Sequence, residues 1–140
     1  MFLIDTNVIS ELMRATPAPS VLSWFSTQDP TTLYLSAVTE AELRTGIAIL
    51  PEGQRREGLK AALDATISED FEGRILPFDT DAAKAYAEIA SIRRAAGRPI
   101  ADADCQIAAI ARAAGAIVVT RNLRDFEGCG VDLVNPWGDQ

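Results

Sequence analysis

Four acidic residues stand at positions where their surroundings make a charged side chain informative. Asp5 directly follows an apolar run at residues 1–4, and Asp125 lies shortly after a second apolar run at residues 116–120. Glu42 stands at helical spacing from apolar residues that include Ile49, and Asp104 stands one turn before Ile107 and Ala108, so each acid is expected on the inward face of its helix. An ionised side chain there is costly unless another group compensates its charge.

These acids favour one kind of chemistry if they meet in space. Carboxylates brought together raise one another's pKa, and a cation relieves that repulsion. The chain has no histidine, which excludes Ser-His-Asp and Cys-His hydrolases and every histidine-ligated metal site. Oxygen ligands alone favour Mg²⁺ or Mn²⁺, and such an ion activates water beside a phosphate. We therefore predict phosphodiester hydrolysis, with the same four acids as catalytic residues and metal ligands.

Each acid also has a structural explanation when it is taken alone. Asp5 is followed by Thr and Asn, as at a helix N-cap, and Asp104 suits the first turn of a helix, where the helix dipole favours an acid. Glu42 could lie at the edge of its apolar stripe and reach solvent, and Asp125 could be a solvated acid in a turn. These alternatives stay open for single residues, whereas the coincidence of all four favours a site.

Short apolar strands alternate with helices along the chain. We expect strands at 1–4, 33–36, 75–78, 116–120 and 131–134, and helices at 8–14, 21–26, 37–50, 52–71, 79–96 and 101–114. This alternation predicts an α/β fold around a mostly parallel sheet. Ligands of such sheets bind beyond the carboxyl ends of the strands, where Asp5 and Thr120 are expected.

The totals describe an ordinary single domain, residues 1–140. The chain is 48% hydrophobic, lacks an apolar run of about 18 residues, and has no basic leader before its first apolar residues. We expect a cytoplasmic protein without a membrane contact, in which Cys105 and Cys129 are free thiols. Cys105 is interpreted as a packing residue and Cys129 as a turn residue. The net charge of −7 is unexpected for a nucleic-acid enzyme, since phosphate affinity normally comes from Lys and Arg.

Four segments of the chain resemble a known family in their order and separation. They are Leu3-Ile4-Asp5-Thr6-Asn7-Val8-Ile9-Ser10, Glu40-Ala41-Glu42-Leu43-Arg44-Thr45-Gly46, Pro99-Ile100 through Asp104 with Ile107-Ala108-Ala109, and Thr120-Arg121-Asn122 with Asp125-Phe126. Together they resemble the PIN domain, in particular the VapC/FitB-like toxins of type II toxin–antitoxin pairs. The similarity extends from Leu3 to about Pro136.

The resemblance implies a PIN fold, with a central parallel sheet of about five strands flanked by helices. It implies a Mg²⁺- or Mn²⁺-dependent endoribonuclease that leaves 5′-phosphate and 3′-hydroxyl ends. By motif, Asp5 and Asp104 match direct metal ligands, Glu42 a direct or water-mediated ligand, and Asp125 a residue that positions a second ion or the attacking water. The polar residues that match the pocket lining are Thr6, Asn7, Thr120 and Asn122.

Three arginines beside the motifs, Arg44, Arg121 and Arg124, are candidates to contact the phosphates of RNA, or else solvated surface residues. The resemblance also implies a cognate antitoxin, a segment of which, often bearing an Arg, is expected to occupy the acidic groove. It further implies a homodimer, and contact with DNA only through the antitoxin. Trp24 and Phe25 are expected either in such a contact or in the core.

Two other readings compete with a nuclease. A phosphoacceptor receiver domain also places acids at strand ends, but it needs a lysine at a late strand end, and the two lysines, Lys60 and Lys84, fall on helices. A catalytically silent PIN-like scaffold that binds RNA or protein is the main alternative. The complete set of acids argues against it.

Overall fold

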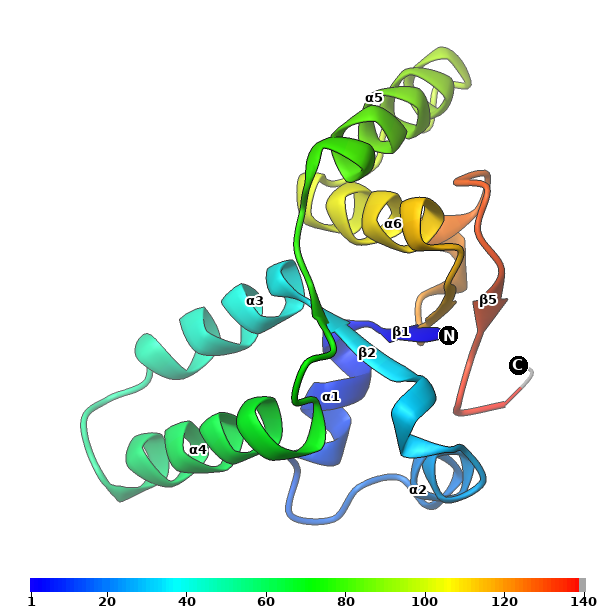
Figure 1. The fold of residues 1–140 in the computed structure, drawn as a ribbon. Helices are drawn as coiled ribbons and strands as arrows, with labels where there is room; N and C mark the ends of the chain where they lie inside the picture. Colours follow the sequence, from blue (N-terminus) through cyan, green and yellow to red (C-terminus); the bar gives the residue numbers. More distant parts are fainter. Residues whose placement is uncertain (139–140) are drawn as a thin grey trace.

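A computed structural model describes residues 1–138, so the last two residues of the predicted domain lie outside the described part. Five parallel strands form one sheet in the order β3-β2-β1-β4-β5 (Figure 1). The α/β class and the parallel sheet of about five strands are therefore confirmed. The strands are β1 (Phe2–Ile4), β2 (Leu33–Ser36), β3 (Ile75–Leu76), β4 (Ile117–Val119) and β5 (Leu133–Val134).

The helices follow the predicted order with shifted ends. The α-helices are α1 (Thr6–Leu12), α2 (Pro19–Ser26), α3 (Ala37–Ala48), α4 (Gln54–Ala65), α5 (Thr80–Ala95) and α6 (Asp102–Ala114). Three short helical segments complete the fold: η1 (Pro30–Thr32), the π-helical η2 (Thr66–Asp70) and η3 (Leu123–Phe126).

Two predicted elements differ from the structure for physical reasons. The helix expected over residues 52–71 is α-helical only to Ala65 and ends in the π-helical turn of η2. The strand expected at 75–78 stops at Leu76, because Pro77 has no N–H to continue a ladder. Asp79 caps α5 as predicted, since its side chain accepts a hydrogen bond from the Ala82 N–H at 3.0 Å.

The sheet has two buried faces because successive side chains of a strand point in opposite directions. Leu3 and Val118 pack with buried residues of α5 and α6, whereas Ile4 and Val119 pack with those of α1, α2 and α4. Figure 1 shows the α5–α6 pair on one side of the sheet and α1, α2 and α4 on the other. Apolar runs without alternation, as in β1 and β4, are what a strand covered on both faces requires.

The strand order reverses beside β1, which lies between β2 and β4. The Asp5 N–H donates to the Val119 carbonyl oxygen at 2.9 Å, so the β1–β4 pairing continues to the residue that starts α1. A reversal of strand order opens a crevice beyond the carboxyl ends of the strands. Asp5 and Thr120 therefore lie where such folds bind their ligands.

Cys105 and Cys129 are free thiols, as predicted, and both are buried. Burial raises the pKa of Cys105 to about 11, which fits a packing residue. Cys129 lies in a turn, as expected, but its side chain is part of the core. No helix within residues 1–138 has the length and hydropathy needed to cross a membrane. The cytoplasmic location stays a prediction.

The C-terminus of α6 supplies a test of the fold. Gly115 ends this helix with φ +68°, and nothing within 4 Å would meet an added Cβ, so Gly115→Ala introduces backbone strain alone. We expect a loss of about 1 kcal/mol in the free energy of unfolding, measured in urea. Gly46→Ala, inside α3 with equally open space, is the control and should stabilise by about 0.5 kcal/mol. Equal effects of the two changes would contradict this account.

Candidate active site

The Asp5 carboxylate is the centre of the site. It is only 4% exposed and accepts hydrogen bonds from three donors: the Thr6 N–H at 2.8 Å, the Thr120 hydroxyl at 2.8 Å and the Asn7 side-chain amide at 3.2 Å. Asp5 thus caps α1, which was the structural alternative, and it uses Oδ1 for that cap. Its second oxygen, Oδ2, faces Thr120 and Asn7. The capping and pocket roles are compatible.

Three of the predicted pocket residues form a network with Asp5. The buried Thr120 hydroxyl accepts from the Asn122 N–H at 3.0 Å and from the Asn7 amide at 3.4 Å. The side-chain oxygen of Asn7, Oδ1, in turn accepts a hydrogen bond from the Arg121 backbone N–H at 3.3 Å. This network joins the start of α1 to the segment after β4, which is more than 110 positions away in sequence.

Glu42 reaches the site, but from an exposed position and not from the inward face of its helix that the spacing predicted. Its helix buries Thr39 and Leu43, whereas Glu42 is exposed and Ile49, expected on the same inward stripe, is 78% exposed. The Glu42 carboxylate accepts a hydrogen bond from the Thr6 hydroxyl at 2.7 Å. The Thr6 hydroxyl also lies 3.1 Å from the hydroxyl of Thr39, a buried residue that was not among the predicted site residues.

Asp104 lies in the first turn of α6 and is half-buried. Within residues 1–138, no donor forms a hydrogen bond with its carboxylate. Burial and the nearby charges of Asp5, Asp125 and Glu42 raise the pKa of Asp104 to about 6, against an ordinary value of 3.8. Asp102, two residues earlier in the same turn, instead accepts a hydrogen bond from the Tyr86 hydroxyl at 3.1 Å.

Asp125 lies in η3, beyond the end of β4, and is exposed. Its charge contributes to the raised pKa of Asp104, and with Glu42 it also raises the pKa of Asp5, for which burial is the largest cause. Hydrogen bonds from Thr120 and the Thr6 N–H act in the opposite direction on Asp5. The charges of Glu42 and Asp125 therefore act on both Asp5 and Asp104, and the charge of Asp5 acts on Asp104.

The donor chemistry of this acid cluster (Asp5, Glu42, Asp104 and Asp125) fits a hard divalent cation. Among residues 1–138, no three acidic or cysteine side chains are grouped closely enough to hold an ion by themselves. Mg²⁺ is usually bound by one or two carboxylates and keeps several waters, so a closed cage is not required. The Asp104 carboxylate accepts no hydrogen bond from the described residues and has a raised pKa, so it has the properties of a ligand that a cation would stabilise.

Comparison with known proteins assigns the family. The PIN domain family model matches residues 2–128. The chain belongs to the PIN-domain family. VapC ribonuclease Y4jK of Sinorhizobium fredii is 46% identical over 137 residues, which are 98% of each chain. Toxin FitB of Neisseria gonorrhoeae is 43% identical over 99% of this chain and all of that protein. The crystal structure of FitAcB from Neisseria gonorrhoeae has a TM-score of 0.92 at 43% identity, covering 98% of this chain and 99% of that one.

The arginines of this PIN domain have partners outside the acid cluster. Arg44 forms ion pairs at 2.8 Å with Glu40 and with Asp64, and it thereby joins α3 to α4. The Arg121 guanidinium stacks over the ring of Trp137, 4.8 Å from its centroid. A phosphate contact by either residue would have to replace or extend these interactions, so both contacts stay predictions.

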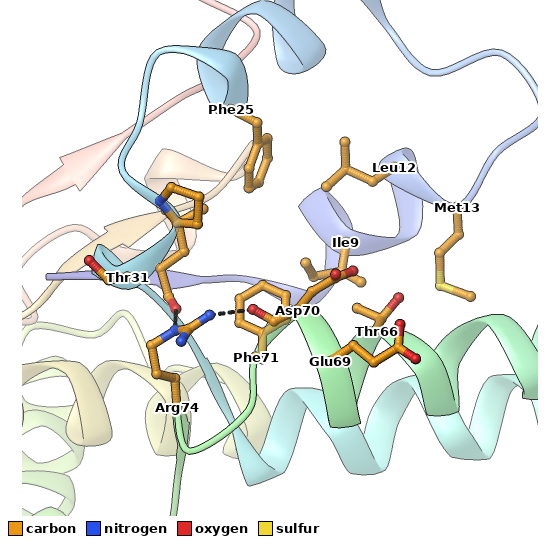
Figure 2. Close-up of a pocket in the computed structure, with 12 residues that line it drawn as sticks. Ile9, Leu12, Met13, Phe25, Thr31, Thr66, Glu69, Asp70, Phe71 and Arg74 are labelled. Atoms are coloured by element: carbon orange, nitrogen blue, oxygen red, sulfur yellow. Dashed lines mark hydrogen bonds between the residues drawn. The ribbon is translucent and has the colours of Figure 1, made fainter.

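Two hollows lie beside α1. One, of about 660 Å³, has a largely apolar lining from α1, α2 and η2. It shares no residue with the acid cluster. Figure 2 shows Phe25, Leu12 and Phe71 around it. The other, of about 840 Å³, includes Thr6 and Glu42 in its lining, together with Arg14 and Arg55. Trp24 and Phe25 are half-buried against the core, and Phe25 also faces the first hollow.

The raised pKa of Asp104 gives the PIN domain a pH-dependent stability. Because this pKa is higher in the folded than in the unfolded chain, the folded state retains a proton that the unfolded state has lost, and stability falls as pH rises from about 4 to about 6. Asp104→Asn removes this loss of stability at higher pH, because an amide does not ionise. In EDTA, we expect the variant to unfold with the same free energy as the wild type near pH 4 and with on the order of 1 to 3 kcal/mol more at pH 7.5.

Urea unfolding across that pH range measures this difference. A difference between variant and wild type that stays constant from pH 4 to 7.5 would contradict the raised pKa. Measuring in EDTA matters, because a bound cation would stabilise the ionised carboxylate and hide the effect.

Proposed function

We propose that this chain is a Mg²⁺- or Mn²⁺-dependent endoribonuclease of the VapC/FitB type, the toxin of a type II toxin–antitoxin pair. The observation that carries the proposal is the buried Asp5 carboxylate, held by three donors at the reversal of strand order and surrounded by the charges of three other acids. The ribonuclease and toxin names of the relatives at 46% and 43% identity support it.

A divalent ion bound by Asp5 and Asp104, with Glu42 and Asp125 nearby, would supply an activated water and charge neutralisation at the phosphate. The chain's own residues prepare the site for that purpose. Thr120, Asn7 and the Thr6 N–H hold Asp5 in one orientation, and the Thr6 hydroxyl orients Glu42. Asp5 and Glu42 therefore need little rearrangement when substrate arrives.

RNA is the proposed substrate despite the net charge of −7. Bound cations invert the local potential of an acidic pocket, so the acids near the site need not repel phosphates. The segment that follows β4 carries Arg121 and Arg124, which are both exposed and are candidate phosphate contacts. Absence of histidine agrees with direct attack of water, since no histidine pair is present to activate a 2′-hydroxyl.

The proposed partner is a cognate antitoxin, as the relative named Toxin FitB supports. A segment of the antitoxin with a basic side chain near the acids would suit the hollow that includes Thr6 and Glu42, whose lining also offers apolar residues such as Leu43 and Leu59. Homodimer formation and DNA contact through the antitoxin complete the proposal. Neither changes the chemistry of the acid cluster.

Cleavage of a single-stranded RNA by the purified chain in Mn²⁺ or Mg²⁺ tests the activity. We expect cleavage that EDTA abolishes, with 5′-phosphate and 3′-hydroxyl ends. Asp5→Asn should lower the rate by more than about 100-fold, because it removes a charge in direct contact with the ion. Asp102→Asn is the control, since Asp102 is exposed and bonded to Tyr86. Comparable losses in both variants, or RNA binding without cleavage by the wild type, would favour the silent scaffold.

Metal binding can be measured without substrate. At pH 7.5, Mn²⁺ should raise the midpoint of thermal unfolding of the wild type, because an ion that binds only the folded state stabilises it. Asp104→Asn should lose most of this rise, whereas Asp102→Asn should keep it. An unchanged response in Asp104→Asn would remove Asp104 from the ligand set.

A further inference from the structure

Arg93 is a buried cation that the proposed chemistry does not use. It lies in the last turn of α5 and is only 7% exposed. Its guanidinium donates from Nε to the Arg98 carbonyl at 2.7 Å, and from Nη1 to the carbonyls of Asp125 at 3.0 Å and Glu127 at 2.9 Å. The same nitrogen lies 3.7 Å from the Cys129 sulfur.

The partners of this guanidinium are unusual for a buried charge. Among the ion pairs within residues 1–138, none includes Arg93, so every acceptor it contacts there is uncharged. A buried charge without an ionic partner is costly, and three backbone carbonyls offset only part of that cost. The attraction between Arg93 and Asp104, which acts to lower the pKa of Asp104, supplies a further compensation from the acid cluster.

Its contacts join the two segments that carry the last two acids. Arg98 belongs to the connection between α5 and α6, and Asp104 lies in the first turn of α6. The Asp125 and Glu127 carbonyls belong to η3 and the turn that follows it. That turn folds over Arg93 through Gly128, which has φ +75° and whose added Cβ would lie 3.9 Å from the Arg93 Cδ.

We propose that Arg93 is a positioning residue of the nuclease site: by holding the carbonyls of Asp125 and Glu127 it fixes the backbone that carries the Asp125 carboxylate relative to Asp104. The inference rests on the proposed function. The geometry favours this role because Nη1 bonds the carbonyl of Asp125 itself and the one two residues later. A shift of the guanidinium must therefore shift the Asp125 backbone.

Arginine suits this task better than lysine. The planar guanidinium directs Nε to one segment and Nη1 to the other at the same time, whereas an ammonium is a single point of donation. Arg93→Lys keeps a cation but loses this fixed fork. Arg93→Met removes both the charge and the donors while it keeps much of the side-chain volume.

A double-mutant cycle with Asp125→Asn separates positioning from a general loss of stability. We expect Arg93→Met to lower kcat for RNA cleavage about 10-fold, with KM changed less than about 2-fold, as for groups that orient a ligand. In the Asp125→Asn background the same change should cost less than about 2-fold, because the carboxylate that Arg93 positions is already gone. Arg94→Met is the control: Arg94 is the next residue of α5, its side chain is exposed, and the change should leave kcat unchanged.

Hydrogen exchange supplies a readout that does not need activity. In Arg93→Lys the amides of residues 122–129 should exchange about 10-fold faster, whereas those of β1 and α1 should not change. This variant also carries the kinetic cycle if Arg93→Met does not fold. Equal losses of kcat in both backgrounds, or unchanged exchange at 122–129, would overturn the inference.

Failure of this inference can be distinguished from failure of the proposed function. A wild-type chain that does not cleave RNA refutes the nuclease, and the cycle is then measured on the affinity for Mn²⁺ alone, by titration calorimetry. Non-additive losses of Mn²⁺ affinity for Arg93→Met and Asp125→Asn would support the positioning role. Additive losses, or no loss in either single variant, would overturn it.

Discussion

The burial of one carboxylate at the end of the central strand is the constraint on which the site depends. Asp5 takes part in the β1–β4 ladder through its N–H, caps α1 with one oxygen, and presents the other to Thr120 and Asn7. Fold and site thus share the same side chain. The backbone that closes the sheet fixes the carboxylate, and the carboxylate fixes the start of the helix. A position defined by three elements is hard to disturb, which is what a site that must hold charge in one place requires.

The charges around Asp5 follow from its position. Three further acids approach from α3, α6 and η3, and together they make ionisation of Asp5 and Asp104 unfavourable. The chain compensates part of this with Arg93, a buried cation that bonds to the backbone of η3, and with hydroxyl and amide donors around Asp5. Asp104 receives no such donor within residues 1–138, so the compensation is incomplete at the acid with the most strongly raised pKa.

The carboxyl ends of β1 and β4 were predicted to within one residue, because apolar runs that stop at a polar residue mark both the strand and its rim. Asp5 and Thr120 were identified in this way. Helix faces were harder: Glu42 was placed on an inward stripe with Ile49, but the buried stripe of α3 is Thr39 and Leu43, and Glu42 reaches the site from an exposed position. Periodicity alone cannot distinguish two faces of a helix whose apolar residues are few. Arg93 and Thr39 were missed because their partners lie on other elements, and nothing local in the sequence marks such pairs.

The incompletely compensated charge of the acid cluster connects the proposed catalysis to its inhibition. A carboxylate whose ionisation is unfavourable gains stability from any cation that reaches it, whether the cation is a divalent ion or the side chain of an arginine. In the proposed function, an antitoxin segment with one basic residue would supply the positive charge that the cluster lacks and would occupy the space proposed for water and phosphate. Because the ion and the basic side chain would satisfy the same electrostatic demand, we expect their binding to be mutually exclusive by charge as well as by volume. In the proposed function, the acids that would support the nuclease reaction are then also the feature through which an antitoxin would inhibit it.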